Sequence, residues 1–324
     1  MPTRDVLVIG SHVYGIYASV RSLPRPGETV LAEGFEPEML DDGGKGSNQA
    51  MAAALLCAQT TFVGVVGPDQ VADRGLARLR AAGVDAAVRR SATALTGVSM
   101  AVVDAQGMSI IVTDPGANRE LNAADLDAVR FADHAVTLLQ FESPIGVVLE
   151  AARRASTAGS RAIVTPGPLV ALESGALEGI DVLAPNQSEA AGLLGVEAIG
   201  PAAGAVRAIR ELWGVGNVIL TRGAEGSTLL WEDQILEVPA FAVEARNTIG
   251  AGDGFVAAFA AALAWRLPVD DAVRFASAVA AIAVSQPGAP WASYPRRDAV
   301  IAFLGAQGET ALAQRIDDLP INNG

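Results

Sequence analysis

The sequence has almost no cysteine and very little histidine. Its 324 residues include one cysteine, Cys57, which excludes an internal disulfide framework and suits a reducing cytoplasm. The two histidines, His12 and His134, have no neighbours at metal-ligand spacing, so both are expected to be structural. These absences exclude a disulfide-stapled scaffold and give no sign of a histidine-ligated metal centre.

Positive charge is also scarce. The chain carries 23 Lys and Arg against 36 Asp and Glu, with a net charge of -13 and a pI of about 4.6. Such a surface repels polyanions, which predicts that neither nucleic acid nor a membrane is a partner. No basic stretch followed by an apolar one opens the sequence, and the longest apolar run, residues 255–265, is too short to cross a bilayer. We therefore expect a cytoplasmic protein.

Two kinds of apolar run alternate along the chain, and 51% of its residues are hydrophobic, enough for one large domain or two modest ones. Continuous runs typical of strands buried on both faces occupy residues 5–10, 62–66, 135–139, 162–165, 181–183 and 217–221. Helical spacing is found over residues 47–58, 71–82, 145–157, 187–194, 203–213, 253–265 and 269–285. This order predicts an α/β fold with a mostly parallel sheet between helix layers.

Two segments depart from this alternation. Residues 28–42 follow a Pro/Gly turn and are expected to be extended, and residues 97–114 are expected to form a hairpin with its turn at 104–107. They are either ordinary edge strands or a small β lid over a site at the carboxyl ends of the main strands.

The most informative segment is residues 247–254, which read N-T-I-G-A-G-D-G directly before an apolar helix. Glycine lets backbone N–H groups approach an anion closely, and a helix N-terminus adds positive potential. A carboxylate at this point, Asp253, is suited either to capping the helix or to acting as a general base. Glycines on both sides of Ala251 are needed only by the second arrangement, an anion hole that faces a base.

A second glycine-rich segment, residues 41–49, reads D-D-G-G-K-G-S-N-Q before another apolar helix. It is not a Walker loop, because Lys45 is followed by Gly46 rather than by Ser or Thr and the upstream glycine spacing is absent. No G-x-G-x-x-G pattern precedes a helix, so a dinucleotide-binding Rossmann fold has no support. Taken alone, the segment is a tight turn before a helix capped by Ser47.

Together the two segments resemble the signatures of the ribokinase-like (PfkB) carbohydrate kinase family, with ribokinase the nearest in pattern. G-G-K-G-S-N-Q-A at 43–50 resembles the first signature, and N-T-I-G-A-G-D at 247–253 resembles the second, usually D-T-x-G-A-G-D. Segments 23–30, 115–118, 141–144, 185–190 and 221–226 resemble ribokinase segments in the same order. Since the resemblance runs through most of the chain in register, chance similarity is a poor explanation.

The resemblance implies roles for individual residues. Asp253 would take the proton of the attacking hydroxyl, while Gly250, Ala251 and Gly252 would offer N–H groups to the transferring phosphoryl. The positions that match the family's sugar-binding residues are Gly43, Gly44, Asn48 and Glu142, together with Asp253. The positions that match its nucleotide side are Asn186, Thr221, Gly223 and Gly226. Glu189 completes an N-x-x-E element associated with phosphates and magnesium, and ATP with Mg²⁺ is the expected cofactor pair.

Several of these residues have a plainer interpretation when they are considered without the family. Glu142 is then a solvated carboxylate at a strand end. Asn186 is a turn or helix cap after a proline. Trp291 either stacks on a base or packs in the core, and the core is the default.

The sequence departs from the family at the sugar side. Ribokinases carry G-S-x-N-x-D after the first strand, where the Asp binds sugar hydroxyls, but here Val13 and Gly15 stand at the Asn and Asp positions. A buried site that loses such an acceptor leaves a sugar hydroxyl unpaired, which argues against ribose as the substrate. Asp41 and Asp42 are candidates for a replacement carboxylate and are otherwise surface charges.

A second departure concerns a monovalent cation. Asn247 stands where the family usually has the Asp that helps to bind an activating potassium ion, so an oxygen ligand is kept and a charge is lost. The expected ring of ligands is Asn247, Ile249, Val284, Pro287, Gly288 and Ser293. Potassium dependence is left open by the sequence.

These observations predict one ribokinase-like domain over residues 1–324, a three-layer α/β/α fold with a mostly parallel central sheet and a discontinuous β lid from about 13–42 and 97–114. The expected activity is ATP-dependent phosphorylation of a sugar or sugar-like alcohol, in a homodimer as in relatives. The alternatives are a nucleoside or sugar-acid kinase of the same fold, and a catalytically silent sugar-binding or regulatory protein.

Overall fold

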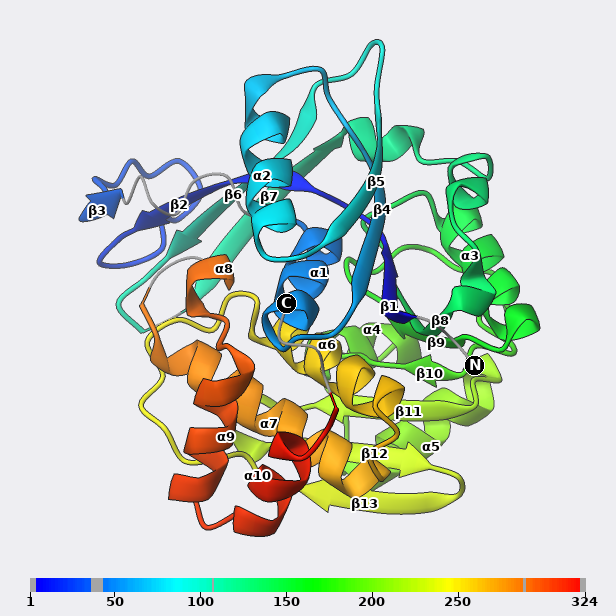
Figure 1. The fold of residues 1–324 in the computed structure, drawn as a ribbon. Coiled ribbons are helices and arrows are strands. Elements are labelled where there is room, and N and C mark those ends of the chain that lie inside the picture. Colours follow the sequence, from blue (N-terminus) through cyan, green and yellow to red (C-terminus); the bar gives the residue numbers. More distant parts are fainter. Residues whose placement is uncertain (1–3, 36–42, 107, 288–289, 321–324) are drawn as a thin grey trace.

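The computed structural model describes residues 4–35, 43–106, 108–287 and 290–320, and within them the centre is a nine-stranded sheet (Figure 1). Its order is β13-β12-β11-β10-β9-β8-β1-β4-β5, parallel from β11 to β5 and antiparallel across β11, β12 and β13. The bounds are β1 Arg4–Ile9, β4 Thr60–Val66, β5 Asp85–Arg90, β8 His134–Gln140, β9 Arg161–Thr165, β10 Val182–Leu183, β11 Asn217–Thr221, β12 Ser227–Trp231 and β13 Gln234–Val238. The predicted mostly parallel sheet is confirmed.

Helices cover both faces of this sheet, as the alternating pattern predicts. One layer holds α1 Lys45–Leu55, α2 Gln70–Ala81, α6 Ala251–Ala264, α7 Val269–Ser285, α8 Pro290–Ser293, α9 Arg297–Ala306 and α10 Thr310–Asp317. The other holds α3 Ile145–Ala158, α4 Gln187–Leu194 and α5 Ala202–Trp213. Within the described ranges, none of the helices combines the length and the hydropathy that a membrane span requires.

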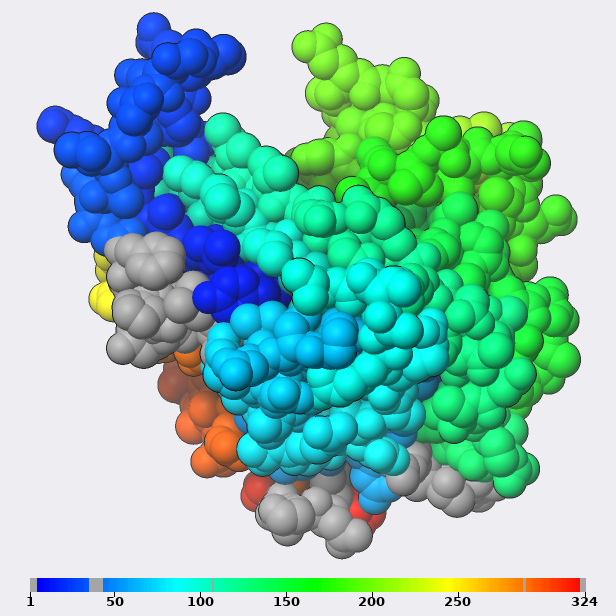
Figure 2. Space-filling model, turned by 90° about the horizontal axis from the view of Figure 1, so that it is seen from above, coloured from blue at the N-terminus to red at the C-terminus, as the bar shows by residue number. Residues whose placement is uncertain are grey.

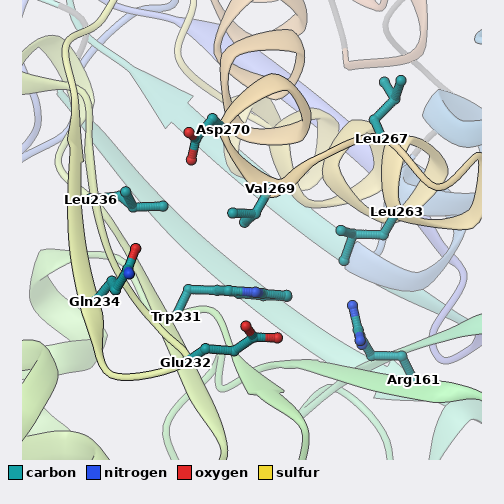
Figure 3. Close-up of a pocket in the computed structure, with 9 residues that line it drawn as sticks. All are labelled: Arg161, Trp231, Glu232, Gln234, Leu236, Leu263, Leu267, Val269 and Asp270. Atoms are coloured by element: carbon teal, nitrogen blue, oxygen red, sulfur yellow. The ribbon is translucent and has the colours of Figure 1, made fainter.

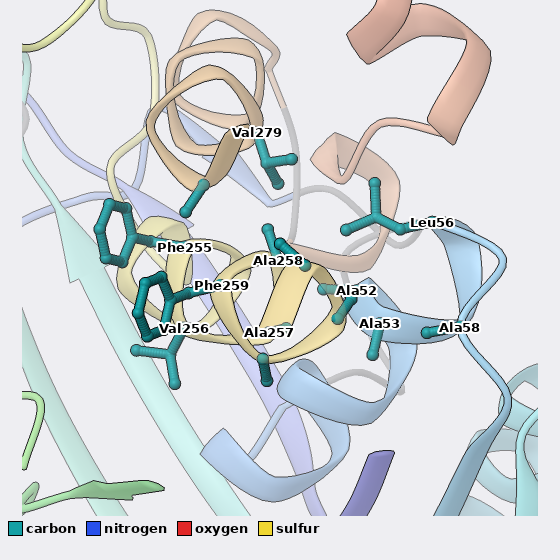
Figure 4. Close-up of a cluster of buried hydrophobic side chains, with 14 of the residues drawn as sticks. Ala52, Ala53, Leu56, Ala58, Phe255, Val256, Ala257, Ala258, Phe259 and Val279 are labelled. Carbon is teal, nitrogen blue, oxygen red and sulfur yellow. The ribbon is translucent and has the colours of Figure 1, made fainter. Parts of the chain in front are cut away.

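Small side chains let the helices of the first layer pack closely. α6 is apolar on all sides because it lies between α1, α7 and the sheet (Figure 4). Ala257 and Ala258 of α6 and Ala53 of α1 are fully buried, and Phe259 packs edge-on against Trp231 with 5.8 Å between ring centroids. Alanine has no side-chain rotamer entropy to lose on burial. The packing of α6 against α1 therefore fixes the N-terminus of α6 at little entropic cost.

A separate four-stranded sheet stands beside the main one, in the order β3-β2-β6-β7. Its bounds are β2 Val13–Ser19, β3 Gly34–Phe35, β6 Thr96–Val103 and β7 Ser109–Gly116. The predicted hairpin is therefore confirmed. Of residues 28–42, which are predicted to be extended, 34–35 form β3 and 28–33 form no strand, while 36–42 lie outside the described residues. Asp41 and Asp42 lie outside the described residues.

The first turn of α1 packs directly on the end of β1. A Cβ atom at Gly46 would lie 2.5 Å from the backbone nitrogen of Ser11 and 2.7 Å from the carbonyl carbon of Gly10. Only glycine fits at this distance, because real Cβ atoms do not approach backbone so closely. The glycine that follows Lys45 is thus explained by packing. The same packing brings Lys45, Asn48 and Gln49 to the carboxyl edge of the sheet.

Replacing Gly46 by alanine should lower the free energy of unfolding by about 1–3 kcal/mol, the usual cost of forcing a methyl group into filled space. Urea unfolding measures the change. Gly204→Ala in α5 is the matched control, since a Cβ there meets nothing within 4 Å, and alanine should leave stability unchanged or raise it. Equal stability of the two variants would contradict the close contact between α1 and β1.

Candidate active site

The predicted site residues gather at the carboxyl edge of the parallel strands. Glu142 follows β8, Asn186 follows β10 and Thr221 ends β11, while the N-termini of α1 and α6 reach the same edge. Ligands of open α/β sheets bind outside the carboxyl ends of the strands. In the space-filling view of Figure 2, the blue N-terminal segment and a green segment stand out from the molecule, and the surface is hollowed between them.

Asp253 is the third residue of α6, whose N-cap is Gly250. The alternative in which Asp253 caps the helix is wrong, because the residue lies inside the first turn. It is 6% exposed, and its carboxylate accepts a hydrogen bond on each oxygen. Oδ1 accepts from Nε2 of Gln49 at 3.1 Å, and Oδ2 accepts from Nδ2 of Asn48 at 3.2 Å.

The turn before Asp253 requires glycine at its first position. Gly250 has a φ of 76°, and a Cβ there would lie 2.7 Å from Cβ of Pro290 and 2.8 Å from the hydroxyl of Tyr294. The same hydroxyl donates to the carbonyl of Gly250 at 2.9 Å. Gly250, Ala251 and Gly252 therefore lead into a buried helix, and the N–H of Ala251 donates to the carbonyl of Thr248 at 3.3 Å. Their part in holding a phosphoryl group stays a prediction.

Glu142 is not the solvated carboxylate that its position at a strand end suggests. Its Oε2 accepts from Oγ of Ser11 at 2.5 Å and from the backbone N–H of Lys45 at 2.7 Å. Burial raises the pKa of Glu142, and the charge of Asp253 adds to the effect, against the opposing influence of Lys45 and the two hydrogen bonds. Glu142 thus ties the ends of β1 and β8 to the start of α1.

Lys45 is the residue that the sequence prediction missed. Burial lowers the pKa of Lys45, but the charges of Asp253, Glu142 and Glu189 outweigh it and raise that pKa above its ordinary value. An ammonium that stays protonated among three carboxylates is a natural partner for phosphate oxygens. The glycines on both sides of Lys45 were the sequence signal for a phosphate-binding lysine. Without the Walker spacing, that signal did not single out Lys45.

Asn186 and Glu189 form a capping box at the start of α4. Oδ1 of Asn186 accepts from the backbone N–H of Glu189, and Oε2 of Glu189 accepts from the backbone N–H of Asn186, each at 2.9 Å. The plainer interpretation of Asn186 as a helix cap is therefore correct. Burial raises the pKa of Glu189, and Asp253 adds to this, while Lys45 opposes it.

The predicted nucleotide-side residues lie in a tight loop after β11. Thr221 is bridged to Asn186, so the ends of β10 and β11 lie side by side. Gly223 and Gly226 have φ values of 56° and 91°, and the backbone of Arg222 donates to the carbonyl of Gly226 at 2.8 Å. The loop presents backbone rather than side chains to the carboxyl edge.

The sugar-side glycines precede α1 and face β2. The carbonyl of Gly43 accepts from the backbone N–H of Val13 at 3.1 Å and from Oγ of Ser47 at 2.5 Å. Gly44 is the N-cap of α1, and its carbonyl accepts from the backbone N–H of Asn48 at 2.9 Å. Ser47 is therefore inside the helix rather than its cap. Val13 and Gly15 are both buried, so the family's missing polar groups have left an enclosed position.

The predicted cation ligands already use much of their hydrogen-bonding capacity. Oδ1 of Asn247 accepts from the backbone N–H of Ile249 at 2.9 Å, and the carbonyl of Val284 accepts from the backbone N–H groups of Arg246 and Asn247 at 2.7 and 3.2 Å. Oγ of Ser293 donates to the carbonyl of Pro290 at 2.9 Å. Pro287 is exposed, and Gly288 lies outside the described residues.

The histidines and Trp291 are structural in the sense that the sequence predicts. Nε2 of His134 contacts Oγ1 of Thr61 at 3.0 Å, and the backbone of His12 is paired with the side chain of Asn118. Trp291 is 5% exposed, so the core prediction holds, yet its indole also reaches Asn48 in the site.

A well-formed pocket lies elsewhere, at the opposite end of the sheet (Figure 3). It has a volume of about 350 Å³ and is lined by Arg161 at the start of β9, by Trp231 and Glu232 after β12, and by Leu263 and Val269 at the α6–α7 connection. Asp253 and Leu263 are at opposite ends of α6, about 15 Å apart along the helix axis. This pocket is therefore separate from the cluster of titratable groups.

Comparison with known proteins agrees with the geometry. Residues 3–293 match the pfkB family carbohydrate kinase model. The chain is 32% identical over 294 residues to a ribokinase of Staphylococcus aureus, covering 89% of this chain and 95% of that protein. It is 31% identical over 297 residues to a deoxyribokinase of Salmonella typhimurium, covering 90% and 95%.

A solved structure shows the same fold. Arabidopsis thaliana ribokinase, complexed with ribose and ATP, superposes with a TM-score of 0.81 at 30% identity, covering 94% of this chain and 99% of that one. Sequence and structure thus agree over nearly the whole length. The chain belongs to the pfkB family of carbohydrate kinases and is an ATP-dependent sugar kinase.

Proposed function

We propose that the chain transfers the γ-phosphoryl group of ATP to a hydroxyl of a sugar or sugar-like alcohol with Asp253 as the general base. The observation that carries the proposal is a buried carboxylate inside the first turn of α6, beside the N–H groups of Gly250, Ala251 and Gly252. Asp253 removes the hydroxyl proton as the oxygen attacks phosphorus, and the bond from phosphorus to the ADP oxygen breaks. The helix N-terminus stabilises the charge on the transferring group.

The nucleotide is assigned to the loops after β10 and β11, through Asn186, Thr221, Gly223 and Gly226. Lys45 supplies a fixed positive charge toward the transferring group, since Asp253, Glu142 and Glu189 keep it protonated. Glu189 is the acidic residue suited to magnesium, because an oxygen ligand whose burial raises its pKa gains from a nearby cation. Magnesium, when bound, neutralises charge on the triphosphate.

The substrate is assigned to Gly43, Gly44, Asn48 and Glu142, on the side of Asp253 that faces the small sheet. We propose that residues 1–324 act as one kinase domain in which the sheet of β2, β3, β6 and β7 serves as a lid. Val98, Met100, Ile110, Ile111 and Val112 on that sheet are exposed. Covering them in a homodimer would remove apolar surface from water, which supports dimerisation through the lid in a cytoplasmic protein.

A screen for ADP release across sugars, sugar alcohols, sugar acids and nucleosides tests the activity and ranks the substrates. A nucleoside or a sugar acid in first place would replace the sugar assignment within the same fold. Clear ligand binding without phosphorylation of any acceptor would favour a silent sugar-binding or regulatory protein and would contradict the proposal.

Asp253→Asn should lower kcat on the best substrate by about 10²–10⁴-fold, the usual contribution of a general base. ATP affinity, measured by calorimetry on the same variant, should stay close to that of the wild type because Asp253 faces the acceptor. A variant that retains wild-type kcat would show that Asp253 has no catalytic role.

Ribose should be a poor substrate, because Val13 and Gly15 supply no polar side chain where the family binds sugar hydroxyls. One lost charged acceptor corresponds to roughly 30–1000-fold in kcat/KM. Steady-state kinetics of ribose against the best substrate of the screen measure the ratio. Ribose in first place with a micromolar KM would overturn this expectation.

Potassium activation should be weak or absent. Asn247 lacks the charge of the family's Asp, and its Oδ1 is used within the loop by Ile249. The measurement is a potassium titration at constant ionic strength, balanced with tetramethylammonium, on wild type and Asn247→Asp. Activation that appears only in Asn247→Asp is the expected result. Strong, saturable activation of the wild type at low millimolar potassium would refute it.

A further inference from the structure

Two neighbouring side-chain amides donate hydrogen bonds to the carboxylate of Asp253. Asn48 and Gln49 are consecutive in α1, and each donates an amide N–H to a different oxygen of Asp253, at 3.2 and 3.1 Å. Both residues are buried, at 6% and 0% exposure, so an amide that faced the wrong way could not pair its N–H groups or its oxygen with solvent instead. The direction of each amide, nitrogen or oxygen toward Asp253, therefore decides whether the carboxylate meets donors or acceptors.

Each amide is held in direction by a second donor behind it. Nε1 of Trp291 donates to Oδ1 of Asn48 at 3.0 Å, and Nε2 of Gln140 donates to Oε1 of Gln49 at 2.6 Å. An indole N–H is only a donor, so the oxygen of Asn48 must face Trp291 and its NH₂ must face Asp253. Gln49 is further fixed by a 3.3 Å hydrogen bond from its Nε2 to Oγ1 of Thr165.

The backing residues are themselves buried. Trp291 is 5% exposed, stacks on His12 with 6.0 Å between ring centroids, and has the guanidinium of Arg78 4.9 Å from its ring. Gln140 is fully buried at the end of β8. The network thus joins α1, α6, α8 and β8, so its polarity is set by the tertiary structure rather than by any one segment.

We propose that Trp291, Gln49 and Gln140 are positioning residues for the general base. By directing two N–H groups at Asp253, they present a donor to each oxygen of its carboxylate. A misdirected amide would set its own oxygen against the carboxylate instead. The network also fixes the rotation of the carboxylate toward the acceptor hydroxyl. This inference rests on the proposed function and goes beyond it, since it assigns catalytic readiness to residues that touch neither substrate nor nucleotide.

Other charges act on Asp253 and must be held constant in any test. Those facing it are Lys45 on α1, Glu142 after β8 and Glu189 on α4. Around Trp291 and the turn before α6 lie His12, Arg78 and Tyr294. The substitutions below keep all of these groups. Trp291→Phe alters the ring beside His12 and Arg78, whereas Gln140→Leu leaves that ring unchanged, so agreement between the two variants reports the amide network.

Trp291→Phe keeps a ring in the core and removes one N–H, which frees Asn48 to turn its oxygen toward Asp253. With the base misplaced, kcat should fall by about tenfold, the equivalent of one lost hydrogen bond, while the KM for ATP stays close to that of the wild type. Gln140→Leu frees Gln49 in the same way and should lower kcat with the same unchanged KM for ATP.

Trp265→Phe is the matched control. Its Nε1 donates to Oδ2 of Asp5 at 3.4 Å, near the far end of α6, so the variant loses an indole hydrogen bond without touching the network. It should lower stability without lowering kcat. Thermal unfolding and ATP binding of every variant separate loss of fold from loss of positioning.

The outcomes are distinct from those of the proposed function. If Asp253→Asn loses turnover but folded Trp291→Phe and Gln140→Leu keep the wild-type kcat, the positioning role is refuted and the general base stands. If Asp253→Asn retains turnover, the general base itself is refuted. An equal loss of kcat in Trp265→Phe would also overturn the inference, because the effect would then follow stability.

Discussion

The site depends on one constraint, the burial of the Asp253 carboxylate at the N-terminus of α6. A buried charge is costly unless donors and opposite charge surround it. Here Asn48 and Gln49 supply the donors, and the helix end and Lys45 supply positive potential. Lys45 stands among Asp253, Glu142 and Glu189, so the cluster is negative overall when these groups are ionised. A triphosphate meets this cluster favourably only with an added cation, which is the physical reason for expecting magnesium.

The packing of α1 against β1 and α6 fixes where the first turns of α1 and α6 lie. Gly46 allows α1 to start at van der Waals contact with the end of β1, and the alanines between α1 and α6 keep the two helices close. Both helices therefore point their first turns at the same carboxyl edge. In the proposed function, these two closely packed helices would position the substrate hydroxyl against the transferring phosphoryl group, and positioning is a main requirement of phosphoryl transfer.

The acceptor side differs from the family's ordinary pattern in a consistent way. Val13 and Gly15 stand where the family has Asn and Asp, so β2 offers no polar side chain at these positions. The catalytic side keeps its glycines, its carboxylate and its lysine. A site altered at the acceptor and intact at the phosphoryl group is expected when the chemistry is kept and the substrate changes.

The sequence alone determined the parallel sheet, most helices and the position of the candidate base, because apolar periodicity and glycine spacing are local signals. It missed the two edge strands, β5 and β13, because their half-exposed residues form no continuous apolar run, and it also missed β12, whose residues are all buried. Only the tertiary structure decided that Glu142 is half-buried and hydrogen-bonded to Ser11, that Lys45 sits among three carboxylates and that Trp291 faces Asn48 across 243 positions of chain. Burial and electrostatic environment arise from contacts between distant segments, and no local pattern encodes which segments will meet.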